Sequence, residues 1–96
     1  MSANNFKVFY ASDNTVTYVS SPIQQDSNQN RSVVFQANVN TGDTVVLQAR
    51  LDSSMEWVNI LTATDDDIMQ EVITAAEFRI SVTNTSGLAV KCAMAV

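Results

Sequence analysis

Two stretches of the chain alternate between inward-facing apolar positions and outward-facing positions, each on both sides of a short turn that contains a glycine. In the first, residues 33–39 and 44–51 flank the turn at 40–43, and in the second, residues 78–83 and 88–96 flank the turn at 84–87. Because successive side chains of a strand point to opposite faces of its sheet, the alternation predicts two β-hairpins that each bury one face. The residues expected on the buried faces are Val33, Phe35, Ala37, Val39, Val45, Leu47, Ala49, Leu51, Phe78, Ile80, Val82, Leu88, Val90, Cys92, Met94 and Val96.

The rest of the chain also favours strands. Val alone supplies thirteen of the 96 residues, and β-branched and aromatic residues are the ones that strands prefer. Strands are expected over 6–10, 15–19 and 57–61, with turns at 13–14 and 52–54. The polar stretch 20–31 is expected either as a loop that crosses between sheets or as an arm that binds a partner.

The segment 64–77 has two interpretations. Thr64 could cap a short helix near 65–76, with three aspartates in its first turn, where the helix dipole favours negative charge. The alternative is an acidic turn at 65–67, a strand over 69–73 and a turn at 75–76. We favour the strand, since it continues an antiparallel series between two neighbouring strands.

Together these segments predict one all-β domain over residues 1–96. Several short strands separated by turns at regular intervals are typical of an antiparallel β-sandwich, jelly-roll-like or Ig-like, or of a small barrel, with about seven or eight strands. We expect a core anchored by the large apolar side chains of Phe35, Leu47, Trp57, Phe78 and Ile80. The alternative for Trp57, the single Trp, is a platform on which a sugar stacks.

Composition argues against several classes of function. The chain has no His, which is the commonest general base and metal ligand. Five Lys and Arg against ten Asp and Glu give a net charge of −5, which disfavours direct binding to nucleic acid. The single Cys92 excludes an internal disulfide and is expected as a buried, inert thiol. No apolar stretch approaches the ~20 residues of a membrane-spanning helix, and no secretory signal is recognisable.

The charged residues are interpreted as structural. Asp43 and Asp52 are expected in turns, and the run at 65–67 is expected in a solvated turn or at a helix start, because its spacing is not that of a calcium loop. Arg50 and Arg79 are expected on outward faces, where Glu56 or Glu77 could pair with them. We therefore expect no enzyme activity and no catalytic, metal-binding or cofactor-binding residues.

Uncharged polar residues are abundant. Ser, Thr, Asn and Gln number 34 of the 96 residues, more than twice the 15 charged ones. A surface of this kind suits a protein that presents hydrogen-bonding groups to partners or lies packed among neighbours.

Two motifs resemble those of a known group. The stretch Gly42-Asp43-Thr44-Val45-Val46-Leu47-Gln48 leads through Leu51-Asp52-Ser53-Ser54 to Trp57-Val58-Asn59-Ile60, and Phe78 to Gly87 reads FRISVTNTSG. Over roughly residues 33–95 this resembles small β-sandwich structural proteins of tailed bacteriophage virions. The resemblance implies a strand before Phe78 and no catalytic residues.

Such a protein would be a virion structural protein, assembled in the host cytoplasm. The function expected first is a capsid decoration or cement protein that binds the outer capsid surface and bridges neighbouring subunits. The alternative is a tail or head-fibre module that binds a host surface glycan. The expected partners are the major capsid protein or another virion protein, and further copies of the chain itself. Candidate interface residues are Asn5, Phe6, Phe9 and Ile23.

Overall fold

The computed structural model describes residues 6–24, 33–64, 67–72 and 77–95, and within these ranges the chain forms nine strands and no helix. The expected all-β class is therefore confirmed. The ambiguous segment contains a strand over Ile68–Val72, which is the alternative we favoured, while residues 65–66 and 73–76 lie outside the described ranges. The strands are β1 (Phe6–Ser12), β2 (Val16–Val19), β3 (Ile23–Gln24), β4 (Val33–Asn38), β5 (Thr44–Arg50), β6 (Val58–Thr64), β7 (Ile68–Val72), β8 (Glu77–Asn84) and β9 (Val90–Ala95).

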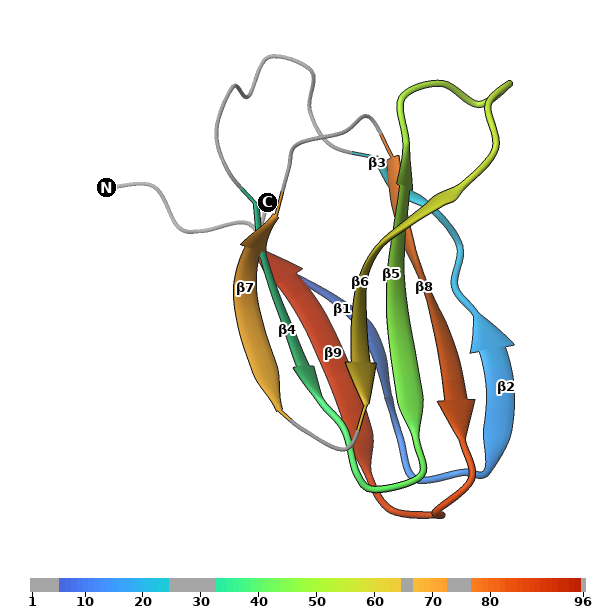
Figure 1. Ribbon diagram of the computed structural model, residues 1–96, viewed down its shortest axis with the longest axis vertical. Helices are drawn as coiled ribbons and strands as arrows, with labels where there is room; N and C mark the ends of the chain where they lie inside the picture. The colour runs from blue at the N-terminus through green and yellow to red at the C-terminus, as the bar shows by residue number, and fades with distance from the viewer. Residues whose placement is uncertain (1–5, 25–32, 65–66, 73–76, 96) are drawn as a thin grey trace.

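The strands form two sheets that lie face to face (Figure 1). Sheet A has the order β1-β9-β4-β7, and sheet B has the order β2-β8-β5-β6, with the short β3 also paired to β8. All the pairings are antiparallel. The chain passes repeatedly from one sheet to the other, and this strand order is that of a jelly roll, the first of the alternatives that the sequence left open.

The two predicted hairpins are wrong. The strands on either side of each turn do not pair, because β4 and β5 lie in different sheets, as do β8 and β9. The turns between them carry the chain across the sandwich, and alternation within a strand does not tell which strand it pairs with. The strand β7 likewise pairs with β4 in sheet A and does not lie between β6 and β8, as we had expected.

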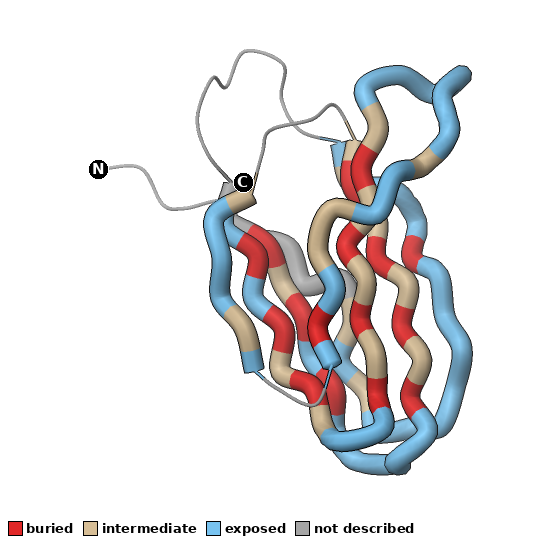
Figure 2. Tube along the Cα trace, viewed as in Figure 1, coloured by how far each residue is buried: buried red, intermediate tan, exposed pale blue. Residues whose placement is uncertain are grey.

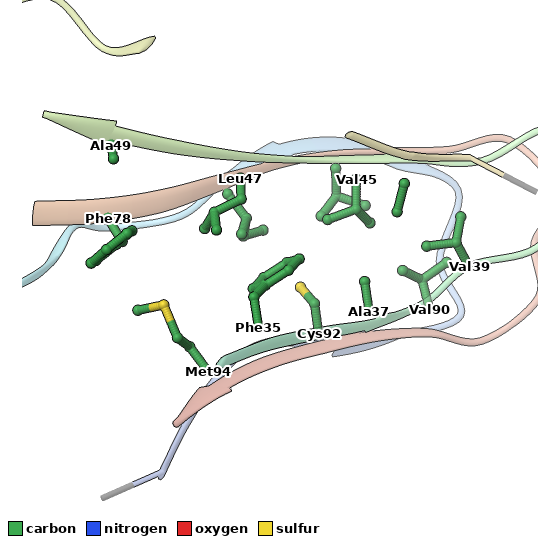
Figure 3. Packing of buried hydrophobic residues seen from close by; sticks show 13 residues of the cluster. Phe35, Ala37, Val39, Val45, Leu47, Ala49, Phe78, Val90, Cys92 and Met94 are labelled. Atoms are coloured by element: carbon green, nitrogen blue, oxygen red, sulfur yellow. The ribbon is translucent and has the colours of Figure 1, made fainter. Parts of the chain in front are cut away.

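The core fills the space between the sheets, as the side chains in Figure 3 show. Along β5 and β8, buried residues alternate with half-buried ones, which gives the banded pattern of Figure 2. Four of the five expected core anchors, Phe35, Leu47, Phe78 and Ile80, are fully buried. The complete cluster comprises Phe35, Ala37, Val39, Val45, Leu47, Ala49, Ala63, Phe78, Ile80, Val82, Val90, Cys92 and Met94.

Two residues that we expected inside lie at the surface. Leu51 is 68% exposed and Leu88 is 57% exposed. Leu51 follows the last residue of β5, and Leu88 precedes the first residue of β9. The alternation that places a side chain inside holds only within the pleated strand, so a residue one or two positions beyond a strand end is no longer directed into the core.

One end of the sandwich is held by hydrogen bonds between two turns. The carboxylate of Asp43, in the β4–β5 turn, accepts bonds from the backbone N–H groups of Thr85 and Ser86 at 2.8 and 2.9 Å, and from the Ser86 hydroxyl at 2.6 Å. The Thr85 hydroxyl donates to the Gly42 carbonyl at 2.7 Å. Gly42 has φ +91°, in the left-handed region that favours glycine. Asp43 is thus a turn residue, as expected, and it also joins turns 42 residues apart.

The beginning of the polar stretch 20–31 runs along β8. The backbone N–H of Ser20 donates to the Ile80 carbonyl, and the Ile80 N–H donates to the Ser20 hydroxyl, both at 3.0 Å. β3 then pairs with the start of β8, where Ile23 lies opposite Phe78. This part of the stretch is therefore integrated into sheet B, and residues 25–32 lie outside the described ranges.

Candidate functional site

The loop between β5 and β6, residues 51–57, is held by local hydrogen bonds. The carboxylate of Asp52 accepts bonds from the backbone N–H of Ser54 at 3.0 Å and from the Ser54 hydroxyl. The N–H of Met55 donates to the Asp52 carbonyl at 2.9 Å. These contacts form the Asx-type turn that we expected at Asp52. The loop projects beyond the end of sheet B (Figure 1).

Arg50, the last residue of β5, fastens this loop to the sheet. Its Nε donates to Glu77 Oε1 on β8 at 2.6 Å, which forms the ion pair that the sequence suggested. Its Nη1 lies 3.2 Å from the Ser53 carbonyl oxygen and 3.5 Å from that of Met55. The side chains of Arg50 and Glu77 are only 17% and 12% exposed. The ion pair with Glu77 thus fixes the Arg50 side chain on the sheet, and its bonds to the two loop carbonyls hold the loop in one conformation.

Trp57 does not anchor the core, which corrects our expectation. It is half-buried and lies outside the core cluster. The guanidinium carbon of Arg50 lies 4.2 Å from the centroid of its ring, and that of Arg79 lies 4.5 Å away. Both arginines occupy outward-facing positions on β5 and β8, so the indole packs against the outer face of sheet B. Cation–π attraction of this kind contributes about 0.5–1 kcal/mol per contact at a surface site.

Arg79 makes fewer contacts than Arg50. Its Nε donates to Gln48 Oε1 at 2.7 Å, and the Gln48 amide donates in turn to Asn59 Oδ1 at 2.8 Å. Among the described residues, no carboxylate lies within ion-pair distance of Arg79, and neither of its Nη atoms has a hydrogen-bond partner. These Nη atoms are not among the buried unpaired atoms of the described chain, so they are open to solvent. The guanidinium of Arg79 is therefore held beside the Trp57 ring, and the N–H groups on its two Nη atoms remain available to donate hydrogen bonds.

Three large apolar side chains lie exposed on or beside this loop. Leu51 is 68% exposed, Met55 is 53% exposed, and Val58, the first residue of β6, is 59% exposed. Val58 lies opposite the buried Ala49 of β5, so its side chain is on the other face of sheet B from Trp57 and Arg79. Leu51 and Met55 belong to the loop itself, and exposed apolar residues that gather in one place are typical of a contact surface. We call the set Leu51, Met55, Trp57 and Arg79 the loop surface.

The interface residues proposed from the sequence lie elsewhere. Asn5 is outside the described ranges, and Phe6 and Phe9 belong to β1 by their backbone, while their side chains are not described. Ile23 is half-buried and packs against the core. The signal that could have indicated the loop surface is the presence of two large apolar residues, Leu51 and Met55, in a short turn that is otherwise mostly polar.

Other ionisable groups have structural surroundings. Asp67, from the acidic run, accepts a bond from the Val39 N–H at 3.2 Å. Cys92 is buried as expected, and burial raises the pKa of its thiol to about 12. In the described part of the chain, no three residues of the types that bind metals come together. Within those same ranges, no helix is long and apolar enough to span a membrane.

Comparisons of the chain with protein families, with curated proteins and with solved structures found no match. The functional argument therefore rests on the geometry of the loop surface and on the jelly-roll scaffold that presents it.

Proposed function

We propose that this chain is a non-enzymatic structural protein that docks onto protein subunits through the loop surface, specifically as a capsid decoration protein of a tailed-phage virion. The observation that carries the proposal is the β5–β6 loop, which is held by hydrogen bonds and presents Leu51 and Met55 to solvent beyond the end of the sandwich. The resemblance of residues 33–95 to small phage sandwich proteins supplies the biological setting. Jelly rolls also occur in viral capsid and lectin domains, which agrees with that setting but does not by itself assign a function.

The small binding free energy that one loop surface can supply favours binding by several copies at once. Burying the exposed parts of Leu51 and Met55 stabilises a complex by about 2–3 kcal/mol. Association costs roughly 4–15 kcal/mol in lost freedom of motion, so one loop surface alone binds weakly. A closed homo-oligomer that places several loop surfaces on a shell gains affinity through effective concentration. We accordingly propose a homo-oligomer bound to the major capsid protein or to another virion protein.

The position of the half-buried Trp57 on the outer face of sheet B favours a second candidate, a tail or head-fibre module that stacks this ring on a host glycan. Two contacts count against it. The ring already lies against the Arg50 and Arg79 guanidinium groups, and the Gln48 and Asn59 amides, which could read sugar hydroxyls, are bonded to each other. Saturable binding on a glycan array that is lost in Trp57→Ala, with the fold intact, would favour this second candidate.

The location of this protein in the virion tests the proposal. Antibodies against the folded chain, visualised with gold on purified virions by electron microscopy, should label the outer shell at many regularly spaced points. Label confined to the tail would favour the glycan-binding candidate. Absence of the chain from purified virions would contradict both.

A further inference from the structure

We propose that Arg79 determines the specificity of the loop surface by binding a carboxylate of the partner protein. The partner segment would then carry an Asp, a Glu or a carboxyl terminus beside apolar residues that cover Leu51 and Met55. This inference rests on the proposed docking function and adds the chemistry of the partner to it.

The two arginines beside Trp57 differ in how many of their guanidinium N–H donors are available to a partner. Arg50 is committed to Glu77 and to two loop carbonyls, so its charge is neutralised and its donors serve the loop. Among the residues that the structure describes, Arg79 has one hydrogen bond, from its Nε to Gln48, and both of its Nη atoms are accessible to solvent. A protein that docks here would therefore contact a guanidinium whose positive charge is not paired with any carboxylate of the described chain.

The side of the Arg79 guanidinium that carries the two Nη atoms is held in place by its neighbours. Gln48 fixes the guanidinium at Nε, the Trp57 ring lies 4.5 Å from the guanidinium carbon, and Gln48 is itself bonded to Asn59 on β6. A guanidinium presents its donors in a planar fork that matches the two oxygens of a carboxylate, and holding that fork in advance reduces the entropy lost on binding. Arg and Trp are also among the residue types that carry most of the energy of protein interfaces.

Charge complementarity points to a carboxylate on a protein. The chain has twice as many acidic as basic residues, yet neither Asp52 nor Glu56 of the adjacent loop lies within ion-pair distance of Arg79. A net charge of −5 opposes a nucleic-acid backbone, which needs many cations rather than one. The Trp57 ring beside Arg79, and the exposed Leu51 and Met55 of the loop that carries this ring, match a protein segment better than they match a free anion.

The test is selection of random heptapeptides, displayed on phage particles, against the immobilised full chain and three variants. Wild type should select peptides in which an Asp or Glu adjoins apolar residues. Arg79→Gln should lose the acidic preference and keep the apolar one. The variant Leu51→Ser/Met55→Ser should lose the apolar preference. Leu88 is an exposed apolar residue of the β8–β9 turn, and Leu88→Ser should behave as wild type.

A selected peptide and its partner with Gln in place of the acid then give a double-mutant cycle by titration. Loss of the carboxylate should weaken binding to wild type by about tenfold, as for a charge-assisted bidentate pair, and should not change binding to Arg79→Gln. Arg79→Lys, which keeps the charge and loses the fork, should fall between. Circular dichroism of each variant verifies that the fold is retained.

The outcomes separate the two proposals. Apolar peptides without an acidic preference would overturn the role of Arg79 and leave the docking loop in place. Acidic peptides without an apolar preference would contradict docking through the loop. Basic peptides, or no selected peptides at all, would overturn the carboxylate proposal.

Discussion

Asp43 and Ser86 lie in different turns, and both carboxylate oxygens of Asp43 accept hydrogen bonds from Ser86, one from its backbone N–H at 2.9 Å and one from its hydroxyl at 2.6 Å. This pair joins the β4–β5 turn to the β8–β9 turn, the two turns that carry the chain from one sheet to the other at this end of the sandwich. The carboxylate of Asp43 is almost completely covered, with only 1% of the residue exposed.

Replacing Asp43 with Ala should lower the melting temperature clearly. The substitution leaves the N–H groups of Thr85 and Ser86 without their acceptor at a covered position, and an unpaired buried donor is costly. Asp13→Ala is the matched control, because Asp13 lies exposed in the β1–β2 turn. Thermal unfolding followed by circular dichroism measures both variants. Equal melting temperatures for the two would show that the contact between the turns contributes nothing.

Stability should fall in acid, in part through Asp43. Burial alone would raise the pKa of its carboxyl, but the hydrogen bonds from Ser86, Thr85 and Asn40 outweigh burial and lower the pKa below its ordinary value of 3.8. A depressed folded-state pKa gives a stabilisation that is present above the unfolded-state pKa and is lost as pH falls through the folded-state pKa. Urea midpoints measured from about pH 5 downward should therefore decline, mostly below about pH 4.

Asp43→Asn should reduce this acid dependence, since Asn does not titrate. Part of the decline should remain, because the pKa of Asp52 is also lowered, chiefly by its bonds from Ser54. Parallel curves for wild type and Asp43→Asn would contradict the assignment.

Replacing the half-buried Trp57 should destabilise the fold less than replacing the fully buried Phe35. Phe35→Ala removes a fully buried ring and should cost about 3–5 kcal/mol of unfolding free energy. Trp57→Ala loses two surface cation–π contacts and should cost only about 1–2 kcal/mol. Urea denaturation followed by circular dichroism compares them. A cost for Trp57→Ala as large as that for Phe35→Ala would place the indole in the core after all.

Cys92 should not react in the native protein. A thiol with a pKa of about 12 is thiolate in only about one molecule in ten thousand at pH 8, and the thiolate is the reactive form. A chromogenic disulfide reagent should therefore label Cys92 in denaturant and leave the folded chain unlabelled over the same minutes. Rapid stoichiometric labelling of the native chain would show that β9 opens readily.

The sequence predicts the interior of this fold better than its surface. The pleat of a strand imposes a period of two, so the buried faces of β5 and β8 could be predicted residue by residue. Alternation does not say where a strand ends. Leu51 lies outside because β5 ends at Arg50, whose guanidinium holds the loop carbonyls of Ser53 and Met55.

Long-range contacts account for the rest of what the sequence did not show. Trp57 was predicted inside because large aromatic residues usually anchor small sandwiches. Its place on the outer face depends on the pairing of β5 with β8, which brings Arg50 and Arg79 together beneath it. The joining of two turns by Asp43 likewise depends on a contact between residues 43 and 86, which no local pattern contains.

The most direct measurement of the central claim is co-sedimentation of the labelled chain with virion shells from which the native protein has been removed. Wild type and Leu88→Ser should sediment with the shells. Leu51→Ser/Met55→Ser should remain in the supernatant, although its unfolding free energy should stay within about 1 kcal/mol of wild type, since two surface substitutions change stability little. Equal sedimentation of all three proteins would contradict docking through the loop surface.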